Sequence, residues 1–499
     1  MTDVSTDRSR WLALYVLCAG MLMIVLDATI VNVALPSIKR DLDFSPSGLA
    51  WVVNAYLIAF GGLLLLAGRF GDLFGQRRVF LIGLSVFTVA SLLCGLAPNQ
   101  TVLVAARFVQ GLGGALTSAV VLGMIVTMFP EPALRAKAIG VYGFVASAGG
   151  SIGLLAGGAL TSAIGWHWIF FVNLPVGVAA GVLATRVVPS RQGIGVKAGA
   201  DVPGAAQLIV GLMLGVYTIL QVSSHGWTAT RTLLLGAIAV ALLTTFLVRQ
   251  ARIANPLMPL RLFRSRTVSG ANVIEALLAA SMFGVSFIGA LYLQQVLGYT
   301  ALGVGLAFLP CTVFMGAVSL GFAAPITARL GTRTTVIIGL ALVMAGLLLF
   351  AHTPVQGNYL VDVLPATILF GVGAGLSVPA LTTAAMSAAT PQDAGLASGL
   401  MNTTVQGGGA IGLSVLATLA AGRTNTMTQR HVTPAIALNT GYHLAYLVAA
   451  ALMTVAIIVA TRTLRPVTDT TMELAEVRAH STEPQLATVV ESQYATAID

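Results

Sequence analysis

Three ionisable residues, Asp27, Arg107 and Glu275, lie inside long apolar stretches of this 499-residue chain. A charged side chain at the centre of a bilayer costs about 3 kcal/mol on insertion scales. A residue that costs so much needs an oppositely charged partner, a water-lined cavity or a proton to carry. An arginine beside an acid favours the charged form of that acid, and so the release of its proton. We therefore predict that these three residues form a proton-coupling group.

Each of the three residues also has a purely structural interpretation. Asp27 lies about 24 Å along its apolar stretch, from the 1.5 Å rise per residue, and could hold two helices together through a hydrogen bond. Arg107 could bond to backbone carbonyls. Glu275 lies about 6 Å into its stretch, so its carboxylate could reach the membrane surface. Asp27 and Asn32 are about 140° apart on a helix, so we expect Asp27 to contact a neighbouring helix and not the cargo.

The composition identifies the elements that must position these residues. Hydrophobic residues make up 57% of the chain, charged residues only 9%, and the mean hydropathy is +0.91. Soluble domains carry about 25% charged residues, so the chain is predicted to be an all-α membrane protein. About fourteen apolar runs are long enough to cross a bilayer. They cover residues 11–35, 48–68, 79–98, 102–128, 136–160, 166–188, 204–223, 231–248, 271–295, 301–325, 333–352, 361–386, 395–421 and 441–463.

The charged loops indicate how the chain lies in the membrane. The first ten residues are polar and no small-residue cleavage site follows, so the first run is predicted to be a retained helix and not a signal peptide. Arginine and lysine concentrate in alternate loops, which places both termini in the cytoplasm. The net charge of +9 is spread over these loops and does not indicate a nucleic-acid partner.

Neither a metal site nor a cofactor is expected. The three cysteines, Cys18, Cys94 and Cys311, each lie in an apolar run, which argues against a disulfide framework. The six histidines lack metal-ligand spacing. The chain has no phosphate-binding loop of the Gly-x-x-x-x-Gly-Lys-Ser/Thr type, so ATP is not expected to drive it directly. An enzyme or a sensor is disfavoured because the chain lacks a catalytic cluster and a sizeable output domain.

The chain repeats itself at a nearly constant offset of 256–260 residues. Gly149 and Gly153 recur as Gly408 and Gly412, and further pairs of glycines and a Gly-x-Arg sequence recur at the same spacing. Two related halves of six helices each are typical of one large class of transporters. We predict an N-terminal six-helix bundle at 1–188, a linker with two inserted helices at 189–266, a C-terminal six-helix bundle at 267–465, and a disordered cytoplasmic tail at 466–499.

The loop after the second apolar run combines glycines with charges, in the sequence from Gly68 to Arg78. Glycines permit a tight turn, and Asp72 can pair with Arg77 or lie against the positive end of a helix. Such a cluster could keep one conformation closed; the alternative is a simple topology anchor. The predicted conformational switch comprises this loop and a glycine stripe: Gly68, Asp72, Gly75, Arg77, Arg78, Gly149, Gly153 and Gly157.

The loop resembles the motif of the major facilitator superfamily, and fourteen helices resemble its drug:proton antiporter branch. The stretches Leu26–Pro36, Trp166–Gly177, Leu293–Tyr299 and Gly395–Gly412 are similar to other motifs of that branch. The resemblance implies two six-helix bundles plus two inserted helices. It also implies proton handling by Arg107 and a role in antiport for the glycine stripe, whose default interpretation is close helix packing.

Three positions depart from the branch. Leu154 replaces a proline of the antiport motif, and His167 and Val405 replace arginines. Because of Leu154, transport of one specific metabolite remains an alternative to drug antiport. Val405 removes a positive charge near the expected cavity.

Neutral polar side chains on several spans suggest a roomy pocket for apolar cargo. The candidate substrate-binding residues are Asn32, Asn54, Tyr56, Gln110, Asn272, Asn402 and Gln406. Taken singly, each of them could equally join two helices. We expect proton-coupled efflux of lipophilic, including cationic, drugs or toxic metabolites across a bacterial-type plasma membrane. The alternative is proton-coupled transport of one specific metabolite or natural product. The expected partners are a small lipophilic substrate, protons and membrane lipid, and we expect a monomer to function.

Overall fold

The computed structural model describes residues 4–45, 48–190, 193, 195, 201–226, 228–253, 256–258, 260–386 and 394–464. Within these ranges the chain is helical and forms no strand. The helices are α1 (Val4–Asp41), α2 (Ala50–Phe74), α3 (Gln76–Gly95), α4 (Gln100–Met128), α5 (Pro132–Ala163), α6 (Trp168–Phe171), α7 (Asn173–Val187), α8 (Val202–His225), α9 (Thr230–Arg252), α10 (Arg266–Leu291), α11 (Ala301–Gly321), α12 (Ala323–Phe350), α13 (Leu364–Met386), α14 (Ala394–Gln429) and α15 (Pro434–Thr463).

Nearly all of these helices are long and apolar enough to cross a membrane. Thirteen candidate spans occur among the described residues. The 32-residue helix α5 has the length of a further span, and its described apolar part is Ile152–Ala163. The expected run at 166–188 is divided into the short helix α6 and the longer α7. The tail predicted to be disordered at 466–499 lies outside the described residues.

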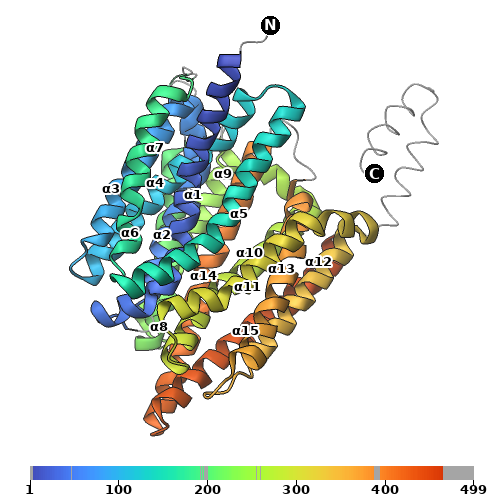
Figure 1. The fold of residues 1–499 in the computed structure, drawn as a ribbon. Helices are drawn as coiled ribbons and strands as arrows, with labels where there is room; N and C mark the ends of the chain where they lie inside the picture. Colours follow the sequence, from blue (N-terminus) through green and yellow to red (C-terminus); the bar gives the residue numbers. More distant parts are fainter. Residues whose placement is uncertain are drawn as a thin grey trace, which may run out of the picture.

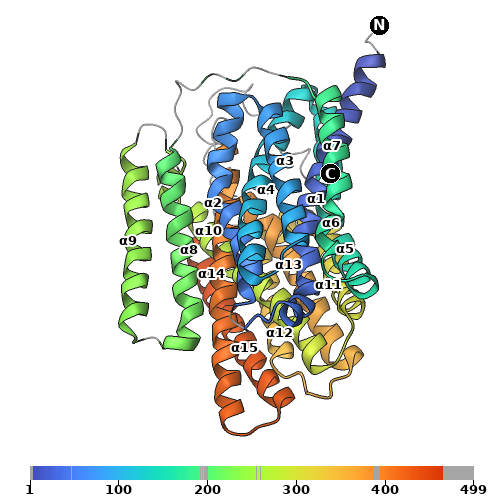
Figure 2. The same cartoon turned by 90° about the vertical axis from the view of Figure 1, so that its left-hand side faces the viewer.

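The helices gather into two groups with a hairpin beside them. Figure 1 shows α1 to α7 on one side and α10 to α15 on the other. The hairpin of α8 and α9 stands at one edge, with α9 outermost (Figure 2). Helix α8 packs against both α2 and α14. A Cβ on Gly62 of α2 would meet Ile209 of α8 at 2.5 Å, and Thr418 of α14 bonds to Ile219 O at 3.1 Å.

Glycines at the repeated positions occupy matching crossings in the two groups. At the crossing of α3 and α4, a Cβ on Gly113 would come within 2.8 Å of Gly83 O. At the crossing of α12 and α13, a Cβ on Gly339 would come within 2.7 Å of Gly373 O. Both backbones approach too closely for a larger residue. Glycines that correspond in the sequence repeat, Gly83 with Gly339 and Gly113 with Gly373, therefore occupy equivalent helix crossings in the two groups.

The two groups meet through two pairs of helices, α5 with α11 and α2 with α14. We call the end that carries the N-terminus and the α2–α3 turn the near end, and the opposite end the far end (Figure 1). At the far end a Cβ on Gly158 of α5 would lie 2.6 Å from Leu302 Cα of α11, and Leu302 N donates to Ser162 Oγ at 3.2 Å. Two helical turns nearer the N-terminus, Gly150 has nothing within 4 Å of its Cβ position. Helices α2 and α14 stay in contact nearer the other end, where Thr403 Oγ1 donates to Gly61 O at 2.9 Å and a Cβ on Gly399 would lie 2.8 Å from Leu65.

Candidate functional site

Asp27 and Arg107 form a buried ion pair inside the N-terminal group of helices. Arg107 Nη1 of α4 lies 2.5 Å from Asp27 Oδ2 of α1. Asp27 is 0% exposed and Arg107 is 1% exposed. An isolated charge would cost far more than this pair does, because each charge is the partner of the other. The sequence-predicted acid and base are therefore in direct contact.

Two amides and a hydroxyl complete a polar cluster around Asp27. Its Oδ1 atom accepts hydrogen bonds from Gln110 Nε2 at 2.8 Å and from Asn173 Nδ2 at 3.1 Å. Both amides also donate to Ser91 Oγ of α3, at 2.6 and 3.1 Å respectively. Three donors thus converge on the two oxygens of Asp27. This cluster joins α1, α3, α4 and α7.

Arg107 uses its remaining surface to contact the second helix. Its Nε donates to Val52 O at 3.0 Å, and its Cζ lies 4.4 Å from the centre of the Tyr56 ring. The sequence analysis treated a backbone bond and an ion pair as alternatives for Arg107. In the structure Arg107 makes both, with Val52 O and with Asp27. The expectation that Asp27 contacts neighbouring helices agrees with this geometry.

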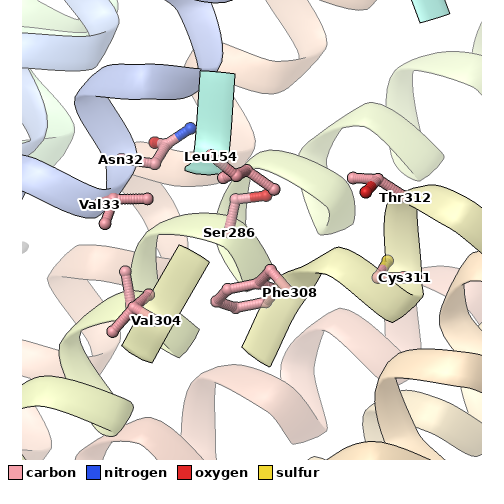
Figure 3. A pocket seen from close by; sticks show the side chains of 9 residues that line it. Asn32, Val33, Leu154, Ser286, Val304, Phe308, Cys311 and Thr312 are labelled. Atoms are coloured by element: carbon pink, nitrogen blue, oxygen red, sulfur yellow. The ribbon is translucent and has the colours of Figure 1, made fainter. Parts of the chain in front are cut away.

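A small cavity lies where the two groups of helices face each other. Its volume is about 60 Å³, and α1, α5, α10 and α11 supply its walls. The lining residues are Asn32, Val33, Leu154, Ser286, Ala290, Val304, Phe308, Cys311 and Thr312. Figure 3 shows Asn32 and Leu154 on one side of this space and Phe308 and Thr312 on the other. An apolar wall with a few hydroxyl and amide groups suits a small, largely apolar ligand.

Of the seven predicted substrate-binding residues, only Asn32 lines the described cavity. Tyr56 and Gln110 belong to the buried cluster around Asp27 instead. Asn54 Nδ2 bonds to Ser414 Oγ at 2.8 Å and so joins α2 to α14. The spacing of residues along the sequence shows which of them share a face of a helix. It does not show whether that face lies in the interior of a bundle or at the wall of a cavity.

The other three candidates lie on α10 and α14, away from the cavity lining. Gln406 packs against α2, where a Cβ on Gly61 would lie 2.6 Å from Gln406 Cβ. Asn402 is exposed. Asn272 is buried, with 4% of its surface exposed, and lies one helical turn from Glu275.

Glu275 is also 4% exposed, so its carboxyl does not extend to the molecular surface as the sequence alternative allowed. Its Oε2 atom is buried and has no hydrogen-bond partner among the described residues. Glu275 belongs to the C-terminal group of helices, whereas Asp27 and Arg107 belong to the N-terminal group. The structure therefore does not bring the three predicted proton-coupling residues into one cluster.

The predicted switch loop adopts its turn without the expected ion pair. Gly75 has φ 94°, a conformation that favours glycine. Asp72 and Arg78 are exposed, and Gly68 has open space around its Cβ position. Arg77 donates to the backbone oxygen of Thr185 in α7, and no Asp72–Arg77 pair occurs among the ion pairs of the described residues. The turn was predictable from the glycine, whereas the partner of Arg77 comes from a distant helix.

The glycine stripe of α5 faces α1. Positions for a Cβ on Gly149, Gly153 and Gly157 lie against Val25, Thr29 and Ile30 respectively. This is the close helix packing that small residues permit.

Several polar residues of the cluster and the cavity escaped the sequence analysis. Ser91 and Asn173 each occur as a polar residue within an apolar run, which was the available signal for them. Ser286, Cys311 and Thr312 line the cavity. Single hydroxyl and thiol groups are too common in spanning helices to be singled out by type alone.

Two groups of spanning helices with a cavity between them are the arrangement found in many membrane transport proteins. The chain belongs to the major facilitator superfamily, whose family model matches residues 17–413. It is 38% identical to the puromycin resistance protein pur8 of Streptomyces alboniger, over 86% of this chain and 85% of that protein. It is also 38% identical to the cephamycin export protein CmcT of Amycolatopsis lactamdurans, over 83% of this chain and 85% of that protein.

Solved structures share this fold. A bacterial homologue of the human lysosomal transporter Spinster, in an inward-facing and unoccupied conformation, has a TM-score of 0.64 and 15% identity, over 91% of this chain and 98% of that one. A peptide transporter in complex with sulfate has a TM-score of 0.65 and 15% identity, over 91% of this chain and 95% of that one. The family model and the 38% identical relatives confirm the sequence resemblance to the superfamily. The chain is an integral membrane protein that moves small molecules and is not an enzyme.

Proposed function

We propose that this protein exports small lipophilic compounds, including cations, across the plasma membrane in exchange for protons. The observation that carries the proposal is the buried Asp27–Arg107 pair inside one bundle, together with a largely apolar cavity between the bundles. The names of the relatives, which include a resistance protein for puromycin and an export protein for cephamycin, support export as the direction.

The division of the chain at 1–188 and 267–465 gives the two bundles that would rock against each other. With both termini in the cytoplasm, as the loop charges favour, the tight α5–α11 contact at the far end faces outward. The near end, where Gly150 has open space, then faces the cytoplasm. This arrangement corresponds to a state that takes up cargo from inside the cell. A single copy of the chain contains every element of this scheme.

Proton exchange would operate through Asp27. The carboxylate accepts hydrogen bonds from Arg107, Gln110 and Asn173. A proton bound to Asp27 would weaken the bond to Arg107 and loosen the junction of α1 with α4. Loss of the proton would restore that junction, so the charge on Asp27 biases the packing of the N-terminal bundle. Glu275, in the opposite bundle, is the second carboxyl that we assign to proton exchange.

Transport of one specific metabolite is the second candidate function. The cavity of about 60 Å³ is smaller than the roughly 300–1,000 Å³ of pockets for drug-sized ligands. Leu154, in place of the proline of the antiport motif, forms part of its wall. A narrow carrier would accept few compounds, whereas a drug exporter would widen this space when the bundles separate.

Dye movement in inverted membrane vesicles separates the two functions. With an acidic vesicle interior, we expect the wild type to accumulate several structurally unrelated cationic and neutral dyes. Vesicles that carry the exposed-site variant Asp43→Asn are the control and should accumulate the dyes like the wild type. Asn is chosen because it tolerates the left-handed backbone at this position (φ 54°). Failure to move any of the dyes would contradict multidrug export and favour the narrow carrier.

A further inference from the structure

Helix α10 carries two buried acceptor oxygens that lack partners. Glu275 Oε2 and Asn272 Oδ1 are both buried and make no hydrogen bond among the described residues. Each side chain is 4% exposed. The amide nitrogen of Asn272 is already occupied, because Nδ2 donates to Val268 O at 2.9 Å. Only acceptor capacity is therefore left at both positions.

Both residues lie on the face of α10 that lines the cavity farther along the helix. At 100° per residue, Glu275 is rotated by only about 20° from Ser286, and Asn272 is in register with Ala290 after five turns. Ser286 and Ala290 line the cavity. The face that packs on α14 carries Ala276 and Ala280, which lie against glycines of that helix. Asn272 is about 40° from Ala276 and so borders this face, whereas Glu275 is about 100° from Ala276.

The position along the helix places the two oxygens between the cavity and the near end. Glu275 precedes Ser286 by eleven residues, which is about 16 Å of helix. Cargo that reached the cavity from the near end along α10 would pass the part of the helix that carries Glu275 and Asn272.

The chemistry of the pair selects one kind of ligand. A buried polar atom without a hydrogen bond costs free energy, and a buried carboxylate without a cation costs more. A protonated amine supplies both the positive charge and several N–H donors, whereas a neutral or anionic group supplies no positive charge. Asp27 offers no comparable site, because Arg107, Gln110 and Asn173 already occupy its oxygens.

We propose that Glu275 and Asn272 form a recognition site for the protonated amine of cationic cargo. The site rests on the proposed function, and it adds contact with the cargo to the proton exchange that we assign to Glu275. Asp27 makes no such contact, because its oxygens are bonded within the N-terminal bundle. Ammonium N–H groups donate to Glu275 Oε2 and Asn272 Oδ1, and the rest of the cargo reaches the apolar cavity.

Equilibrium binding of two dansyl dyes to the purified full-length protein tests the site. N-(5-aminopentyl)dansylamide carries an ammonium group, and its 5-hydroxypentyl analogue is neutral and nearly equal in size. A charge-assisted hydrogen bond contributes enough to change affinity by about tenfold or more. We therefore expect the wild type to bind the amine about tenfold more tightly than the alcohol, and Glu275→Gln to abolish that difference. Asn272→Ala should reduce it by about threefold, in line with the loss of one neutral hydrogen bond.

Glu131→Gln, at an exposed position before α5, is the matched control and should keep the wild-type preference. The unfolding midpoint of each variant shows whether it is folded. Equal affinity of the wild type for the two dyes would overturn the site. A folded Glu275→Gln variant whose affinity falls by the same factor for both dyes would overturn it too. These results differ from a failure of the proposed function, in which vesicles move no dye although the purified protein still distinguishes the amine from the alcohol.

Discussion

At the scale of single residues, Arg107 does more than supply a charge. Its guanidinium contacts Asp27, Gln110 and Val52 O, and it lies over the Tyr56 ring. A planar group with several fixed donors makes these contacts simultaneously, which the single ammonium of lysine does not. The need of Asp27 and Arg107 for a partner was predictable from the cost of a charge in the membrane. The hydrogen bonds of Ser91 and Asn173 were not predictable, because they depend on which helices meet.

Arg107→Lys should therefore lose most transport although it keeps the positive charge. The bond to Val52 O and the stacking on Tyr56 disappear, and we expect the transport rate to fall at least about tenfold, since the substitution is not conservative at a stacked, multidentate site. Initial rates of dye uptake into vesicles at matched protein content measure this. Transport near the wild-type level would show that the charge alone is sufficient.

At the scale of helices, the contact of α5 with α11 depends on a residue without a side chain. A Cβ on Gly158 would lie 2.6 Å from Leu302 Cα, whereas one on Gly150 would meet nothing within 4 Å. The two glycines belong to the same helix, so they form a matched pair. The sequence contains both and does not reveal which of them faces the opposite bundle.

Gly158→Ala should destabilise this state by about 1–3 kcal/mol, the usual cost of overpacking. Gly150→Ala should leave the stability unchanged or raise it by up to about 1 kcal/mol, because alanine favours a helix. Thermal unfolding of the two variants in the same detergent compares them directly. Equal midpoints for both variants would contradict the described α5–α11 contact.

The inserted hairpin has an anchor of its own at the near end. Asp201 is 3% exposed and accepts bonds from Arg249 Nε at 2.8 Å, Gln250 Nε2 at 2.7 Å and Gly204 N at 3.0 Å. Burial tends to raise the pKa of Asp201, but the hydrogen bonds from Arg249, Gln250 and Gly204 outweigh it and lower the pKa below its usual range. The charged carboxylate therefore joins the start of α8 to the end of α9.

Asp201→Asn should lower the stability of the hairpin by about 1–3 kcal/mol, because it removes charge-assisted bonds and weakens the helix cap. A lowered pKa contributes stability above the unfolded value of about 3.9. This contribution is lost as the pH falls through the lower, folded pKa. The gap between wild-type and variant unfolding midpoints should hence narrow below about pH 4. A gap that stays constant from neutral to acid pH would contradict the anchoring role of the charge.

At the scale of the whole molecule, the sequence was sufficient for the fold and insufficient for the site. Apolar runs and the repeated glycines predicted the helices and the two related halves, because membrane burial and close packing act on residue type and spacing. The family came from the resemblance of the Gly68–Arg78 loop and the other motifs. The cavity walls depend on how two bundles face each other. Of the residues predicted to bind substrate, Asn32 lines the cavity, whereas Tyr56 and Gln110 lie within one bundle.

A cross-link at the far end should stop the rocking of the two bundles. Ser162 and Leu302 lie on α5 and α11 and are joined by a 3.2 Å hydrogen bond. In a background in which Cys18, Cys94 and Cys311 are replaced by serine or alanine, cysteines at both positions should block dye transport after oxidation. A reductant should restore it. Undiminished transport by the oxidised, cross-linked protein would contradict alternating access through this contact.

The central claim is that Asp27 exchanges a proton while the bundles move. Vesicles that carry Asp27→Asn, measured for uptake driven by a proton gradient and for exchange of labelled against unlabelled dye, test this claim most directly. We predict that the variant loses gradient-driven uptake and keeps dye-for-dye exchange, which needs no net proton movement. Gradient-driven uptake at the wild-type level in this variant would contradict the claim.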